Sequence, residues 1–203
     1  MKVSYTNSRL SFFAFLYMVV MLAVVPGQAN SQSYSLVPKA QTFMKVTGTS
    51  NVHSWDMTST TMQSKGDFKF DKNHLLTSIQ NFQLSLDAKT LKSKHSSLDN
   101  RAYKVMKASQ HPKIVYNLRS TDVTTLSKNK YLVKVLGDLT IAGSRQVISM
   151  DVNVQVNADN SITCTGTEKI KLSDYNIAAP SYMAGTMKVG NDLTIGFAQT
   201  YHK

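Results

Sequence analysis

The sequence predicts an all-β protein of about eight antiparallel strands with one short helix inserted between them. Three observations predict it. From Phe43 onward apolar residues recur at every second position, short Gly-, Asn- and Asp-containing turns separate these patterns, and a single segment has helical spacing instead. Alternation of this kind is typical of strands that bury one face, and short connections favour antiparallel neighbours.

Residues 1–29 are predicted to be a signal peptide. Lys2 and Arg9 come first, an apolar run of 16 residues follows over 10–25, and small residues end the segment at Ala29. A membrane anchor is the alternative, but a membrane-spanning helix needs about 20 apolar residues. The pattern of charge, apolar run and small residues is that of a cleaved secretory signal. We therefore expect a periplasmic or secreted protein.

The remaining 174 residues suit a single domain. Residues 30–42 are polar and rich in Ser and Gln, so we expect a flexible lead-in to a domain over 43–203. The chain has one cysteine, Cys164, which excludes an intramolecular disulfide. Stability must therefore come from the core.

The mature chain is basic. The full chain has a formal charge of +11. Removal of residues 1–29, which contain Lys2 and Arg9 and no acidic residue, lowers this charge to +9. Such a surplus favours anionic partners, including phosphate head groups and transient contact with a membrane surface; the alternative is a lysine-rich surface that only keeps the protein soluble. Basic and aromatic residues are not interleaved as on a nucleic-acid platform, so we expect no nucleic-acid partner.

The strands follow one another with turns between them. The clearest alternating patterns lie at 81–88, 113–120, 131–141, 148–156 and 192–201. Turn residues separate them, as at 71–73, 127–129, 143–144, 159–160 and 190–191. An antiparallel sheet of this size protects its edges by closing into a barrel or by folding into a sandwich, and periodicity alone does not choose between the two.

The helix is predicted near residues 97–108. Ser96 or Ser97 is expected to cap it, Asp99 places negative charge in the first turn, and Pro112 prevents continuation. One face is apolar and contains Leu98, Ala102, Val105 and Met106. An isolated helix this short is marginal in water, so the apolar face is expected to dock on other structure. If the strands form a barrel, we expect the helix to dock on an open end of the barrel, where it would act as a plug or as a lid that gates entry.

Four passages in this order resemble the YceI-like family, the polyisoprenoid-binding, lipocalin-like proteins of the bacterial periplasm. They are GTSNVHSWDM, LDNRAYKVMKASQHPKIVY, GDLTIAGSRQVISMDV and LSDYNIAAPSYMAGTMKVGNDLTIGF, and they are distributed over nearly the whole length of 43–197. The resemblance implies an antiparallel eight-stranded lipocalin-like barrel that holds a long isoprenoid chain, such as a polyprenyl phosphate or a quinone tail. It implies no required cofactor or metal.

Apolar residues near the helix are the predicted ligand-binding set. On the strands these are Phe82, Leu84, Leu86, Tyr116 and Leu118; the only tryptophan, Trp55, and the helix residues Tyr103 and Met106 complete the set. A tryptophan suits such a place because its large apolar ring has one polar N–H group. The alternative is that these side chains simply fill the core, as they do in many small barrels.

Basic residues on the helix are the predicted head-group site. Arg101 and Lys104, with Lys107 and Lys113 nearby, would hold a phosphate or another polar head. Arginine offers a forked set of donors and lysine a point charge. The alternative is that these are ordinary solvated charges on a helix surface.

We predict no catalytic residue and no metal ligand. The histidines, His53, His74, His95, His111 and His202, do not pair with one another, with cysteine or with carboxylates at a metal-site spacing. In the Ser50, His53 and Asp56 group, the histidine points to the opposite side of an extended strand.

Two alternatives to a binding protein remain open. One is an enzyme that acts on a lipid-like substrate in the same cavity, for which Glu168 and Asp151 are the acids to inspect. The other is a structural or stress-related protein with a solid core. The sequence leaves the oligomeric state open.

Overall fold

The computed structural model describes residues 30–37 and 42–203. The strands, in chain order, are β1 (Asn30–Leu36), β2 (Phe43–Ser50), β3 (Ser54–Ser59), β4 (Gln63–Phe70), β5 (Leu76–Asp87), β6 (Lys113–Ser127), β7 (Lys130–Ile141), β8 (Ser144–Val156), β9 (Ile162–Lys171), β10 (Ser181–Tyr182) and β11 (Met187–His202). The helices are η1 (Ala88–Thr90), α2 (Ser96–Val105) and η2 (Leu172–Tyr175). Among the described residues, no helix has the length and apolar character needed to cross a membrane.

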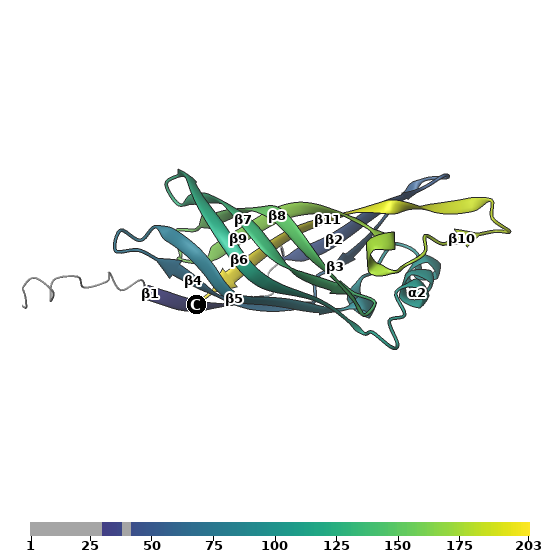
Figure 1. The fold of residues 1–203 in the computed structure, drawn as a ribbon, viewed down its shortest axis with the longest axis horizontal. Helices are drawn as coiled ribbons and strands as arrows, with labels where there is room; N and C mark the ends of the chain where they lie inside the picture. Colours follow the sequence, from purple (N-terminus) through teal and green to yellow (C-terminus); the bar gives the residue numbers. More distant parts are fainter. Residues whose placement is uncertain (1–29, 38–41) are drawn as a thin grey trace, which may run out of the picture.

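Eight of the strands form a closed antiparallel ring. Their order is β1, β4, β5, β6, β7, β8, β9 and β11, and the pairing of Ser35 with His202 and of Leu36 with Tyr201 closes it. Strand β2 pairs with a second length of β11, and β3 pairs with β2. The predicted barrel with one short helix is therefore confirmed, and the sandwich is not the fold (Figure 1).

The flexible lead-in predicted over 30–42 is wrong for its first seven residues. They form β1, which pairs with β4 from Asn30 opposite Phe70 to Ser35 opposite Lys65. Tyr34 is buried and packs edge-on against Phe68, with ring centroids 5.2 Å apart. One aromatic anchor and a complete strand ladder therefore order a segment whose composition is polar. The signal peptide predicted over 1–29 lies outside the described residues.

The helix is confirmed, but its predicted serine cap is not. The N-cap residue is His95, which makes no side-chain capping bond. Asp99 in the first turn instead accepts hydrogen bonds from the backbone N and the Oγ of Ser93, both at 2.7 Å. This buried carboxylate fixes the chain that enters the helix, so neither Ser96 nor Ser97 is needed as a cap.

The two ends of the ring are filled differently. Tyr131, Ile162 and Tyr201 are at most 1% exposed at the end that holds β1 and the C-terminus. Helix α2 lies at the opposite end, which we call the mouth (Figure 1). The barrel is therefore solid towards its termini, and any space for a ligand lies on the side of α2.

Candidate ligand-binding cavity

Helix α2 is fixed over the mouth by Tyr103. The Tyr103 hydroxyl donates to the main-chain oxygen of Leu91 at 2.6 Å and also lies 2.9 Å from that of Lys89. The ammonium group of Lys92 stands 5.2 Å from the centre of the Tyr103 ring. These contacts hold the helix to the segment that follows β5, and they direct its apolar face, with Ala102 and Met106, into the barrel.

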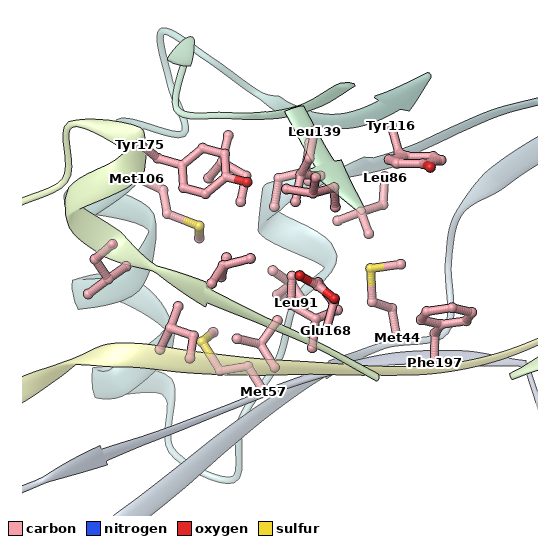
Figure 2. Close-up of a pocket in the computed structure, with 18 of the residues that line it drawn as sticks. Met44, Met57, Leu86, Leu91, Met106, Tyr116, Leu139, Glu168, Tyr175 and Phe197 are labelled. Atoms are coloured by element: carbon pink, nitrogen blue, oxygen red, sulfur yellow. The ribbon is translucent and has the colours of Figure 1, made fainter. Parts of the chain in front are cut away.

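A cavity of about 200 Å³ lies beneath α2. Its walls are inward side chains of the ring strands β5, β6, β7, β8, β9 and β11, together with residues of β2, β3 and η2 (Figure 2). Apolar cavities of about 150 Å³ stay dry and take up small hydrocarbons. This barrel is therefore hollow on the helix side, and the alternative of a solid interior is wrong.

A chain of four aromatic rings, Phe68, Phe82, Tyr116 and Tyr201, which we call the aromatic floor, borders the cavity through Phe82 and Tyr116. The ring centroids are 6.3 Å apart for Phe82 and Tyr116, and 5.8 Å apart for Phe82 and Tyr201. Phe68 continues the chain at 5.9 Å from Tyr201. The two pairs that Phe82 makes are edge-to-face, a favourable arrangement for aromatic rings, and the Phe68–Tyr201 pair is tilted. The floor therefore separates the hollow half from the solid half.

A glycine on β7 makes room for an aromatic ring from the neighbouring strand. On β7 the inward positions run Val135, Gly137, Leu139 and Ile141. Gly137 has no side chain to project inward, and the end of the Tyr116 ring occupies the place that a Cβ atom would take. The alternation in the sequence thus sets which residues face inward, and a glycine in that series admits a ring from the neighbouring strand.

Seven of the eight predicted ligand-binding residues line the cavity: Trp55, Phe82, Leu84, Leu86, Met106, Tyr116 and Leu118. Tyr103 is the correction, because its hydroxyl faces the 89–91 segment and its ring does not line the cavity. Of the head-group pair, Arg101 lines the cavity at the mouth, with its guanidinium 4.6 Å above the ring of Tyr182. Lys104 is exposed and does not line the cavity.

Sequence reasoning missed the contribution of methionines and of η2. Met44, Met57 and Met150 line the cavity from β2, β3 and β8. Methionine is flexible and fits irregular apolar space, so these walls can adapt to a ligand. Tyr175 lines the cavity from η2, a short helix that no periodic pattern in the sequence predicts. The methionines on β2 and β8 follow the inward alternation and were accessible to that reasoning.

Glu168 is the one carboxylate that lines the cavity. It shares inward parity with Cys164 and Ile170 on β9. Burial, and then repulsion from Asp151, raise its pKa above the ordinary value. No hydrogen bond or ion pair joins it to another residue of the described chain. Asp151 itself is exposed and does not line this cavity.

Two tyrosine hydroxyls of the lining also lack partners. Within residues 30–37 and 42–203, no hydrogen bond satisfies the buried hydroxyl of Tyr116 or of Tyr175. Burial raises the pKa of each to about 12, and the negative charge of Glu168 contributes to both shifts. Both hydroxyls are therefore neutral donors at physiological pH. Burial likewise raises the pKa of Cys164 to about 12, which keeps this thiol protonated.

The wall opens beside Glu168. Strands β8 and β9 pair only between Val152–Val156 and Ile162–Gly166. A second, shallow hollow lies over the unpaired lengths, and it shares Met150, Glu168 and Phe197 with the cavity. Glu168 thus stands where the cavity meets a gap in the barrel wall.

The described residues hold no group of three or more His, Cys, Asp or Glu side chains arranged to bind a metal ion. Nor does Cys164 have a hydrogen-bonded base among them. What this arrangement offers chemically is an apolar interior with three unpaired polar groups.

Three solved structures share the fold. Burkholderia cenocepacia BcnA has a TM-score of 0.58 and 21% identity, covering 77% of this chain and 95% of its own. A Saccharophagus degradans domain described as polyisoprenoid-binding has a TM-score of 0.62 and 15% identity, covering 83% and 97%. The Campylobacter jejuni YceI protein has a TM-score of 0.51 and 16% identity, covering 100% and 94%.

A search of curated protein sequences gave no significant match. The model of the YceI-like domain, however, matches residues 34–200, which include every strand of the ring except the first residues of β1 and the last of β11. The chain therefore belongs to the YceI-like domain family.

Proposed function

We propose that this protein is an exported lipid-binding protein that holds one long-chain isoprenoid lipid or quinone in its barrel, as a carrier or as a sequestering protein. The observation that carries the proposal is the apolar cavity beneath α2. Membership of the YceI-like domain family supports it, as does the solved relative that is described as polyisoprenoid-binding.

The energetics suit reversible transport. Burying a methylene group contributes about 0.8 kcal/mol relative to water, so a long chain gains on the order of tens of kcal/mol gross. A membrane solvates the same chain equally well, so transfer between bilayer and protein is close to balanced. A carrier needs this balance, because it must both load and release its cargo.

The cavity has two routes to the surface. One is the mouth, where the Tyr103 hydroxyl helps to hold α2, and the other is the gap between β8 and β9. We propose that α2 gates the mouth. The flexible methionine side chains in the walls then move apart, so that the cavity accepts a lipid chain larger than its volume of about 200 Å³ without ligand.

The head group of the lipid is proposed to lie at the mouth when it carries a phosphate. Arg101 is the cation that both lines the cavity and reaches the surface. The net charge of +9 without residues 1–29 supports transient contact with an anionic membrane surface during loading. Export to the periplasm or outside the cell follows from the signal peptide predicted over 1–29, and sequencing the N-terminus of the mature protein tests it.

The binding experiment uses Trp55, the only tryptophan, which lines the cavity. Titration with an isoprenoid alcohol should change its fluorescence and saturate at one ligand per chain. Ile148→Phe should weaken binding because residue 148 lines the cavity, whereas Val147→Phe on the same strand should not, because residue 147 is 51% exposed on the outer face. Equal effects of the two substitutions, or no saturable binding, would refute the proposal.

A further inference from the structure

We propose that the cavity contains an internal polar subsite, formed by Glu168, Tyr116 and Tyr175, that accepts a neutral hydroxyl group of the isoprenoid ligand in preference to a phosphate. This inference rests on the proposed function and narrows it to a ligand class: alcohols and phenols with an isoprenoid chain.

The first observation is that three polar groups in an apolar cavity have no partner. The hydroxyls of Tyr116 and Tyr175 belong to residues that are 6% and 1% exposed, and neither makes a hydrogen bond within the described chain. Leaving a buried polar group unsatisfied costs about 1–3 kcal/mol. A purely hydrocarbon ligand would leave both tyrosine hydroxyls unpaired, and it would offer nothing to the half-buried Glu168 carboxyl.

The second observation is their placement in one cavity. Tyr116 comes from β6, Glu168 from β9 and Tyr175 from η2, and all three line the same space. Figure 2 shows the Glu168 carboxyl and the Tyr175 hydroxyl directed into it, with Glu168 between the mouth residues and the aromatic floor.

These groups favour a ligand group that both donates and accepts a hydrogen bond. A ligand hydroxyl donates its proton to the Glu168 carboxylate and accepts a hydrogen bond from a tyrosine hydroxyl. A quinone carbonyl satisfies only the tyrosines, because it has no proton to donate. A bond to an ionised group is about twice as strong as a neutral one, so the carboxylate is the main determinant.

A phosphate is excluded from this subsite by charge. Of the Lys and Arg side chains in the described chain, Arg101 is the one that lines the cavity, and it lies over the Tyr182 ring at the mouth. A phosphate beside Glu168 would therefore face a carboxylate with no cation in the cavity lining beside it, because Lys134 lies in the outer hollow that Glu168 borders. Burying an anion without a partner is strongly unfavourable.

The experiment compares three ligands with one tail: geranylgeraniol, its methyl ether and geranylgeranyl phosphate. Dissociation constants are measured by Trp55 fluorescence for the wild type and for each variant, and ratios between variant and wild type remove differences in ligand solubility. Tyr175→Phe should raise the dissociation constant of the alcohol by about two- to twelvefold, as loss of one hydrogen bond does. The dissociation constant of the ether should not change. Glu168→Gln should strengthen the phosphate relative to the alcohol.

Tyr103→Phe is the matched control, because it removes a tyrosine hydroxyl that faces away from the cavity. It should change the dissociation constants of the alcohol and the ether by the same factor. If Tyr175→Phe also affects both equally, or if Glu168→Gln leaves the ratio of phosphate to alcohol unchanged, the subsite is refuted while lipid binding stands. If none of the three ligands binds the wild type, the proposed function fails and the subsite fails with it.

Discussion

The ring of Tyr116 on β6 lies against the α-carbon of Gly137 on the neighbouring strand β7, in the space that a Cβ atom would need. The two residues sit at the depth where the cavity meets the aromatic floor, so the absence of a side chain at 137 sets the position of a ring that shapes the cavity.

Gly137→Ala should therefore lower the free energy of unfolding by about 1–3 kcal/mol, the usual cost of overpacking, as measured by urea denaturation. Gly196→Ala is the control, because the nearest atom to its new methyl group is Thr167 Cγ2 at an ordinary 3.9 Å. The packing account fails if the two substitutions have the same effect.

Tyr103→Phe should accelerate both loading and release of a bound lipid. The substitution removes the hydroxyl that holds α2 to Leu91, and a hydrogen bond of this kind contributes about 0.5–1.5 kcal/mol. Stopped-flow transfer of a fluorescent isoprenoid from vesicles measures the rates. Rates equal to those of the wild type would mean that α2 does not gate entry.

Arg101→Gln should weaken the binding of a polyprenyl phosphate more than the binding of a neutral quinone, because Arg101 lines the mouth and offers a forked set of hydrogen-bond donors. Lys104→Gln removes the same charge from an exposed position outside the lining and should change neither ligand. Equilibrium titration of both ligands measures this. Parallel losses in the two variants would indicate general electrostatic attraction instead of a head-group contact.

Glu168 should make stability depend on pH in a defined direction. Burial and Asp151 raise its pKa in the folded protein above the ordinary 4.5, so the folded state holds this proton more firmly than the unfolded state. Tyr116 and Tyr175, which also face it, stay neutral in this range because their pKa values are about 12. Stability from this group is therefore complete below about pH 4.5 and is lost as pH rises through the folded pKa.

The measurement is the difference in unfolding free energy between the wild type and Glu168→Gln, taken from about pH 4 to about pH 8, the range in which a carboxyl with a raised pKa titrates. The wild type should lose stability relative to the variant as pH rises. A difference that stays constant with pH would show that folding does not perturb this carboxyl.

Much of this architecture could be predicted because strand alternation has a period of two and fixes which side chains point inward. That is why the alternation predicts a shared inward face for Phe82, Leu84 and Leu86 on one strand and for Tyr116 and Leu118 on another, and all five line the cavity. The helix was equally predictable, since its apolar face and Pro112 are local signals.

Other features depend on tertiary contacts that no local pattern records. Strand β1 is polar and is ordered by its partner β4, and Tyr103 turns to a loop although it lies beside the apolar face of α2. Tyr175 reaches the cavity from η2. Whether the barrel is hollow is also a collective property, because it depends on how far the aromatic floor fills the interior.

The central claim is that the hollow half of the barrel holds a long apolar chain, and organic extraction followed by mass spectrometry tests it most directly. Protein purified from its native source, without detergent, should release an isoprenoid lipid at close to one molecule per chain, and Ile148→Phe should release much less. Protein that yields no lipid and takes up none from isoprenoid-containing vesicles would contradict the claim.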